Sequence, residues 1–257
     1  MKKHIASILF LFLLSTFQLI AQSHSVKRLG IEQGLSNNYV VSITQDKQGF
    51  LWFATEEGLN KFDGTRFTTY YKNDLTQDNQ GITGNELNRV YADTKHPIIW
   101  IATQRDGLNA YNYNEQTFTA YQHNPENPHS LITNDVTDIA PSTQHDDCLW
   151  ISTYYRGIEY LDITSGQFTH YNKSTVPSLP CDQTWTVLDG GDGNLYIGHV
   201  GSGFSIFSPK DKSVKNFRNE AGNPMSLPGN DVFCIIKDAN GNIWLGTNNG
   251  LALYDAA

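Results

Sequence analysis

The chain has 257 residues and a formal net charge of −8 at pH 7, and its length suits a single all-β domain. An acidic chain without a basic cluster is a poor nucleic-acid binder, because neutralised phosphates supply most of that affinity. The three cysteines, Cys148, Cys181 and Cys234, follow no metal-like spacing, and an odd count leaves at least one thiol free. We interpret Cys148 and Cys234 as small apolar strand residues, without a disulfide framework.

The N-terminus has the pattern of a secretory signal peptide. Lys2 and Lys3 precede an apolar run from Ile5 to Ile20, and Ala21 is a small residue suited to cleavage. An uncleaved membrane anchor is the alternative, but the run is shorter than the ~20 residues that span a bilayer. We therefore expect residues 1–21 to be a cleaved signal peptide and the exported chain to begin near Gln22.

An apolar segment with one large aromatic residue recurs five times in the remaining chain, residues 22–257. The segment GFLWFATEEGLNKFD at Gly49–Asp63 and the segment GNIWLGTNNGLALYD at Gly241–Asp255 are two of its copies. The aromatic anchors are spaced 48, 50, 46 and 48 residues apart: Trp52, Trp100, Trp150, Tyr196 and Trp244. A near-constant period of this length indicates a repeat architecture.

Each copy contains four strand-like segments separated by Gly, Asn and Asp. The first opens with Asn or Asp, which we interpret as turn-capping residues, and the second carries the anchor. The third follows a glycine, and the fourth has two aromatic residues three positions apart, as in Phe67 and Tyr70. Four antiparallel strands in about 48 residues make one blade of a β-propeller. A parallel β-helix is the alternative, but its shorter coils do not need four turns per repeat.

The expected fold class is therefore an all-β propeller of four-stranded antiparallel blades. The five blades are expected at about residues 34–72, 81–122, 130–172, 178–218 and 226–255. The fifth repeat ends after its third strand and lacks the outer one. The segment Val26–Leu29 has the spacing of an outer strand and is the candidate to complete the last blade of a closed ring.

The segments GLSNNYVVSITQDKQGFLWFATEEGL and GNPMSLPGNDVFCIIKDANGNIWLGTNNGL resemble the two-component regulator propeller repeat. The resemblance covers about residues 25–255. It implies a seven-bladed propeller in the periplasmic sensor region of a hybrid two-component system, followed by a β-sandwich, a membrane helix and a histidine kinase. Such sensors bind glycan-derived oligosaccharides.

This chain has five of those repeats and none of the later domains. The resemblance therefore implies an N-terminal fragment of a receptor, whose partners are the remaining propeller, β-sandwich and kinase domains, with the membrane reached only through them. A homodimer is left open. Faces shaped for a seven-bladed ring resist repacking into a five-bladed one. We therefore expect an open arc with apolar surface on its end blades and with Val26–Leu29 unpaired.

No catalytic, metal or cofactor motif is present in the sequence. The turns at Asp189–Asn194 and Asp238–Asn242 lack the later bidentate Glu of an EF-hand loop, and we interpret them as β-turns. The chain is therefore not expected to be an enzyme. The alternative, a propeller lyase or glycosidase, would require Glu57, Asp106 and His199 to converge.

Ligand binding is the favoured hypothesis, because loops on one face of a propeller differ between copies while the frame stays fixed. Tyr154, Tyr155 and Arg156 combine aromatic planes for a sugar with a planar cation for a carboxylate or sulfate. The other candidate ligand-binding residues are Arg105, Glu57, His199, Asn248 and Trp185. A protein-docking scaffold without a small ligand is the remaining alternative.

Overall fold

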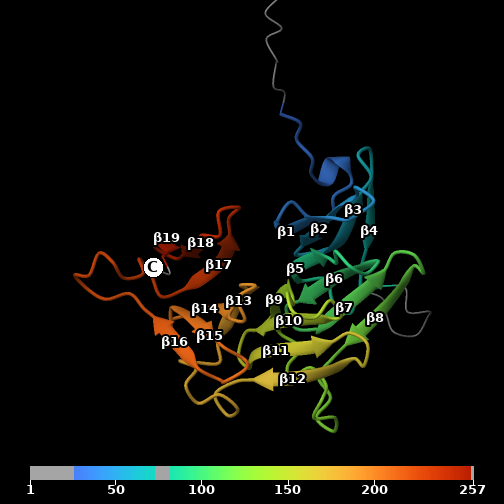
Figure 1. Ribbon diagram of the computed structural model, residues 1–257. Coiled ribbons are helices and arrows are strands. Elements are labelled where there is room, and N and C mark those ends of the chain that lie inside the picture. Colours follow the sequence, from blue (N-terminus) through green and yellow to red (C-terminus); the bar gives the residue numbers. More distant parts are fainter. Residues whose placement is uncertain (1–25, 73–80, 256–257) are drawn as a thin grey trace, which may run out of the picture.

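The structure is a computed structural model that describes residues 26–72 and 81–255, so the signal-peptide prediction lies outside the described residues. These ranges form five antiparallel sheets arranged around a common centre as the blades of a propeller (Figure 1). The expected fold class is confirmed. One 3-10 helix, η1 (Ile31–Gln33), precedes the first blade.

Each blade is built from strands that are consecutive in the chain, and the first strand of each blade contacts the first strand of the next. Blades one and two contain β1 (Val40–Gln45), β2 (Leu51–Thr55), β3 (Gly58–Phe62), β4 (Phe67–Tyr70), β5 (Leu87–Ala92), β6 (Ile98–Thr103), β7 (Leu108–Asn112) and β8 (Thr117–Tyr121). Blade three contains β9 (Val136–Pro141), β10 (Cys148–Thr153), β11 (Gly157–Asp162) and β12 (Gln167–Tyr171). Blades four and five contain β13 (Thr184–Asp189), β14 (Leu195–His199), β15 (Phe204–Phe207), β16 (Val214–Phe217), β17 (Val232–Lys237), β18 (Ile243–Thr247) and β19 (Gly250–Tyr254).

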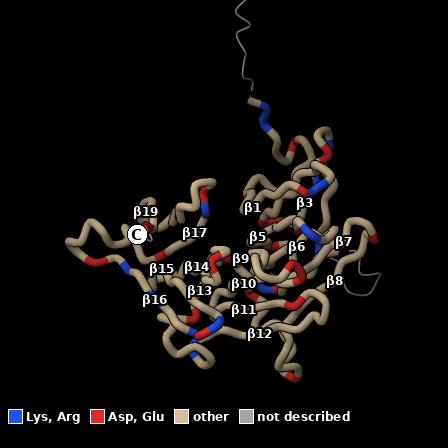
Figure 2. Tube along the Cα trace, viewed as in Figure 1, with Lys and Arg blue, Asp and Glu red and all other residues tan. Residues whose placement is uncertain are grey.

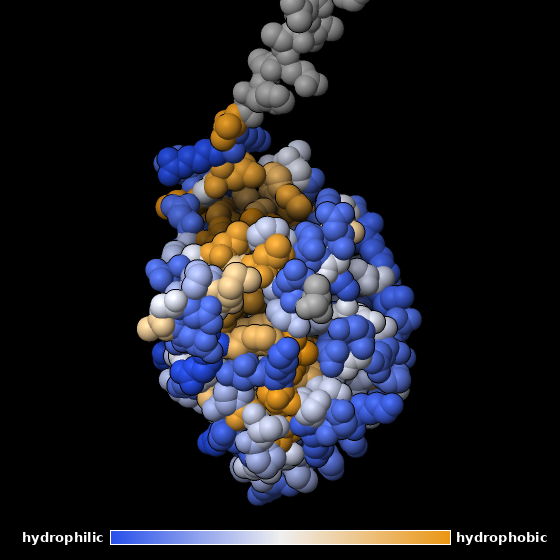
Figure 3. All heavy atoms as spheres, turned by 60° about the vertical axis from the view of Figure 1, so that its left-hand side comes forward, coloured by the Kyte–Doolittle hydropathy of each residue, from blue (hydrophilic) through white to orange (hydrophobic). Residues whose placement is uncertain are grey.

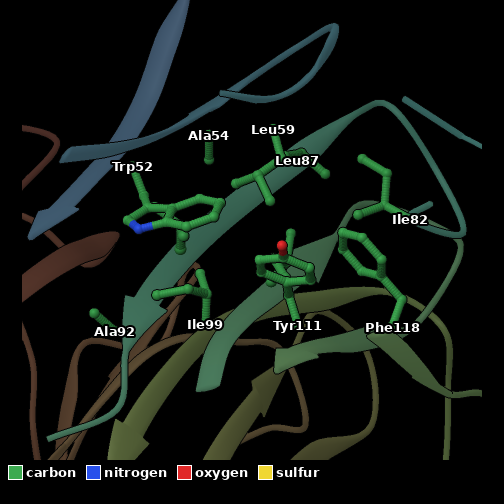
Figure 4. Close-up of a cluster of buried hydrophobic side chains, with 11 residues drawn as sticks. Trp52, Ala54, Leu59, Ile82, Leu87, Ala92, Ile99, Tyr111 and Phe118 are labelled. Carbon is green, nitrogen blue, oxygen red and sulfur yellow. The ribbon is translucent and has the colours of Figure 1, made fainter. Parts of the chain in front are cut away.

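The core lies between the blades, not within them. All six residues of β10 are buried, because neighbouring blades cover both faces of this strand. Trp52 of β2 is fully buried and packs on Tyr111 of the second blade, with ring centroids 5.6 Å apart (Figure 4). Tyr70 of β4 also reaches Tyr111, at 5.2 Å. A large aromatic residue hides ~150–250 Å², so each anchor gains roughly 4–6 kcal/mol of gross transfer free energy.

In blades two to five, the Asn or Asp before the first strand ties its blade to the preceding one. The Asn134 carbonyl accepts a hydrogen bond from the Gly107 N–H of the preceding blade at 2.9 Å. The Asn134 side-chain oxygen accepts another from the His123 N–H at 2.7 Å. Gly107 has a φ of 92°, and a Cβ there would collide with the Tyr121 carbonyl. The predicted turn-capping role of these residues is confirmed.

A carboxylate holds the polar atom of every anchor. The Nε1–H of Trp52 donates to Asp46 at 2.7 Å, and the hydroxyl of Tyr196 donates to Asp192 at 3.0 Å. Trp150 instead donates to Asp189 of the following blade, at 3.3 Å. Because a buried indole N–H is costly to leave unpaired, these carboxylates are structural.

The first and fifth blades leave a gap between them (Figure 1). The fifth blade has three strands, and Val26–Leu29 adopts no strand. Apolar side chains are exposed on the two end faces: Ile43 is 58%, Ile236 54% and Leu251 65% exposed. Hydrophobic residues accordingly reach the surface in a hollowed band on this side of the molecule (Figure 3). The expected open arc and unpaired N-terminal segment are confirmed.

The cysteines differ in exposure, and all three are free. Cys148 is buried at the start of β10, as the sequence predicts for a small apolar strand residue. Cys234 also lies in a strand, β17, but it is exposed. The reason is its position on the end face of the fifth blade, which is not covered by another blade.

Candidate functional site

Every first strand contains a β-bulge at the same position. In β13, Thr184 pairs with His199 and Thr186 with Gly198, so Trp185 between them has no partner in the ladder. A bulge turns such a side chain away from the regular face of the sheet. The corresponding residues of the five blades are Val41, Asn88, Thr137, Trp185 and Phe233.

Three of these side chains, Asn88, Thr137 and Trp185, reach across to the first strand of the next blade. Asn88 donates a hydrogen bond through Nδ2 to the Val136 carbonyl at 2.7 Å. The bulged residues of the fourth and fifth blades, Trp185 and Phe233, meet edge to face with ring centroids 5.7 Å apart. The bulges therefore line the centre of the arc, with polar contacts in one half and aromatic contacts in the other.

Four aromatic residues from three blades form a continuous aromatic series at this centre: Tyr155, Tyr154, Trp185 and Phe233. The ring centroids of Tyr155 and Tyr154 are 4.1 Å apart, and those of Tyr154 and Trp185 are 6.0 Å apart at 84°. Tyr155 is 54% and Phe233 45% exposed, while Trp185 and Tyr154 are half-buried. The series therefore presents aromatic surface to solvent on a rigid frame.

Two carboxylates flank the aromatic series. The pKa of Tyr154 is raised, first by its hydrogen bond with Tyr155 and by burial. The negative charges of Asp135 and Asp231 raise this pKa further. Burial raises the pKa of Asp135 itself, and the nearby positive charge of Arg105 opposes that shift. The local field at Tyr154 is therefore negative, with Arg105 as a cation close to Asp135.

The structure brings together several of the residues that the sequence predicted as ligand-binding. Tyr154, Tyr155 and Trp185 are in ring contact, and Arg105 lies near Asp135. The Asn248 N–H donates to the Asp231 carbonyl at 3.0 Å, which places Asn248 beside the same carboxylate. Arg156 is exposed on the loop that carries the two tyrosines. Glu57 is exposed on the corresponding loop of blade one.

Phe233 was not among the predicted residues. Its place in the repeat is the place of Trp185, since Asp231-Val232-Phe233 aligns with Gln183-Thr184-Trp185. That alignment is the signal that identifies it, once the bulge shows which way the side chain turns.

The prediction that His199 lies in a ligand-binding loop is wrong. His199 ends strand β14, where the other blades have a threonine, and its side chain is fully buried. Its Nε2 is 2.8 Å from Ser205 Oγ and its Nδ1 is 3.5 Å from Cys181 Sγ. Burial lowers the pKa of His199 to about 4, so the ring is neutral at pH 7.

The residues that the enzyme alternative requires lie on different blades. Glu57 is on blade one, Asp106 on blade two and His199 on blade four. Asp106 is engaged in an ion pair with Lys72 at 3.3 Å, and His199 is buried. These three side chains do not form an acid–base pair, so the geometry gives the alternative no support.

A cavity of about 930 Å³ lies elsewhere, beside β19. Its lining includes Phe217 of β16, Leu227 of the following loop and Tyr254 of β19. In the first four blades an outer strand pairs with the third strand at this place. The cavity therefore belongs to the incomplete edge of the fifth blade and not to the aromatic series.

Two segments of this chain match a known propeller repeat. The family described as "Two component regulator propeller" matches residues 34–57 and 226–249, which open the first and fifth repeats. The extracellular domain of the hybrid two component system BT3049 from B. thetaiotaomicron is 68% identical and has a TM-score of 0.84. That match covers 90% of this chain. The chain thus contains two segments that match this repeat, and most of its length is similar to an extracellular domain of a hybrid two-component system.

Two further proteins are similar to this chain. Histidine kinase P4 of Formosa agariphila is 42% identical over 66 residues, which is 26% of this chain and 5% of that protein. The extracellular domain of BT4673 from B. thetaiotaomicron, at 23% identity and a TM-score of 0.71, shows the same fold. The chain spans 30% of the length of the BT3049 domain.

Charge and hydropathy add two observations. Lysines and arginines are scattered along the trace and interspersed with carboxylates (Figure 2). Within residues 26–72 and 81–255, no helix is long and apolar enough to cross a membrane.

Proposed function

We propose that this propeller is the periplasmic ligand-sensing part of a hybrid two-component receptor and that its ligand is a glycan-derived oligosaccharide. The observation that carries the proposal is the aromatic series, which offers Tyr154, Tyr155, Trp185 and Phe233 to solvent at the centre of the arc. Aromatic rings suit the apolar faces of sugar rings, and neighbouring polar groups fix the orientation of a ligand.

The proposal assigns sensing, not catalysis, to the propeller. Its repeat type and its 68% identity to an extracellular domain of a hybrid two-component system support this assignment. Signal output is then the task of the receptor's other domains, namely further propeller blades, a β-sandwich and a kinase.

A glycan panel tests the proposal. Binding of oligosaccharides would be measured by calorimetry on the wild type and on the triple variant Tyr154→Ala, Tyr155→Ala, Arg156→Ala. We expect one class to bind the wild type and to lose at least tenfold in affinity in the variant. Tyr71→Ala is the matched control, because Tyr71 is 49% exposed but lies after the outer strand of blade one. A variant that keeps wild-type affinity would place the site elsewhere, and no binding by any glycan would contradict the proposal.

A further inference from the structure

Asp135 differs from the other carboxylate beside the aromatic series. The two residues occupy the same position in their repeats, directly before the first strand of blades three and five. Asp231 is engaged in the fold, since its Oδ1 accepts a hydrogen bond from the Gly201 N–H at 2.6 Å. Among residues 26–72 and 81–255, no group donates a hydrogen bond to the Asp135 carboxylate. It is nevertheless half-buried, and burial raises its pKa.

The Asp135 carboxylate reaches solvent, since Ser152 Oγ is the one fully buried side-chain polar atom without a partner in the described part of the chain. Its backbone is fixed: the Asp135 carbonyl accepts a hydrogen bond from the Tyr154 N–H at 3.2 Å. The main chain of Asp135 is therefore tied to Tyr154, whose half-buried ring belongs to the aromatic series. A ligand that lies on Tyr154 would find an oriented acceptor at its edge.

An ionised carboxylate accepts hydrogen bonds and donates none. Its two oxygens can accept from two adjacent hydroxyl groups of a sugar. A second carboxylate, Asp231, adds to the negative field at Tyr154. An anionic ligand placed on Tyr154 would therefore be repelled by both groups, a repulsion that Arg105 near Asp135 offsets in part. A neutral sugar brings hydroxyl donors and no charge.

We infer that Asp135 is the specificity-determining acceptor of the site, and that the aromatic series takes neutral, hydroxyl-rich oligosaccharides in preference to uronate- or sulfate-bearing ones. This inference rests on the proposed function and narrows it. It assigns the rings to the flat faces of the sugar and Asp135 to its hydroxyl edge. The cationic fork of Arg156, which the sequence suggested for a carboxylate or sulfate, is not the selecting group.

Calorimetry with paired ligands tests the inference. The probes are gluco-, manno- and galacto-oligosaccharides, together with oligouronates and sulfated oligosaccharides of equal length. We expect the tightest ligand to be neutral. Asp135→Asn should weaken its binding about 10- to 100-fold, because a hydrogen bond to a charged group is lost or reduced. Glu86→Gln is the matched control, since it removes a carboxylate at the same repeat position in blade two, and it should retain wild-type affinity within twofold.

The outcomes are distinct. An oligouronate or sulfated ligand that binds tighter than every neutral one would overturn the inference and leave the proposed sensing function intact. Wild-type affinity in Asp135→Asn, with an unchanged melting temperature, would also overturn it. No binding by any probe would contradict the proposed function and this inference together.

Discussion

Replacing one aromatic anchor inside the arc and one at its end tests whether stability comes from the faces between blades. Trp100 is 0% exposed and lies between the second and third blades, while Trp244 is partly exposed on the fifth. Full burial of ~200 Å² of aromatic surface at about 25 cal/mol per Å² is worth ~5 kcal/mol gross. Trp100→Ala should therefore cost roughly 3–5 kcal/mol in unfolding free energy. For Trp244→Ala, part of that surface is already in water, and we expect a smaller loss of about 2–3 kcal/mol.

Urea midpoints and m-values give the unfolding free energies of the two variants. Because Trp100 and Trp244 occupy the same position in their repeats, each variant serves as the control for the other. Asp93, the partner of Trp100, retains hydrogen bonds from the Lys95 and His96 N–H groups, so no buried carboxylate is orphaned in that variant. An equal loss at both positions would refute the reasoning. A lower m-value in one variant would mean that the blades no longer unfold together, and each transition would then be fitted separately.

Three further predictions follow from particular residues. The pKa of His170 is raised, chiefly by its hydrogen bond with Glu159. The charged His170 therefore contributes fully to stability below the ordinary histidine pKa of 6.5. This contribution is lost as the pH rises through the raised pKa. Urea midpoints across pH should therefore fall above pH 6.5 in the wild type and fall less in His170→Asn; parallel pH profiles would contradict this. The double variant Leu251→Lys, Leu253→Glu should aggregate less, as measured by light scattering, because these apolar side chains are 65% and 50% exposed. Its unfolding free energy should change by under about 0.5 kcal/mol. Unchanged scattering would show that aggregation starts elsewhere. Mass spectrometry of exported protein should show an N-terminus near Gln22, and retention of Met1 would disprove cleavage.

The blades could be predicted from the sequence because the residues that form them recur at a regular interval. Each anchor must be covered by the next blade, so large apolar residues return at a fixed interval, and Gly107 and its counterparts mark the positive φ before each third strand. The open arc could also be predicted, since the fifth repeat of this sequence contains three strand-like segments where the others contain four. These features depend on backbone geometry that every copy shares.

The site was only partly predictable, because it depends on how single side chains turn. Trp185 and Phe233 alternate with buried residues, which in the sequence is the pattern of a regular strand. The bulges in the structure show that their side chains point to the centre of the arc. His199 was misplaced because the end of a strand and the start of a loop look alike in a polar sequence. Aligning it with Thr153 and Thr247 would have located it within the strand.

One exchange of hydrogen-bond partners between the repeats is visible in the sequence. The Ser36 N–H donates to the Asn60 side chain at 3.0 Å, and the Ile132 N–H donates to Glu159 at 2.9 Å. In the fourth and fifth repeats the donor position is a proline, which has no N–H, and the acceptor position is Ser205 or Ala252. The repeats that lack the backbone N–H donor therefore also lack the long polar acceptor side chain. A buried acceptor without a donor would cost free energy.

The bulged residues form the inner wall of the arc and lie outside the hydrogen-bonded ladders of their own blades. A bulged residue has no partner in the ladder of its own sheet, so its identity places few demands on the blade that carries it. The five positions already hold Val41, Asn88, Thr137, Trp185 and Phe233 on nearly the same backbone. The inner wall therefore consists of five variable side chains on a fixed backbone. A repeat of this kind can acquire a new binding preference by one substitution at its bulge position, without a change in how the blade folds.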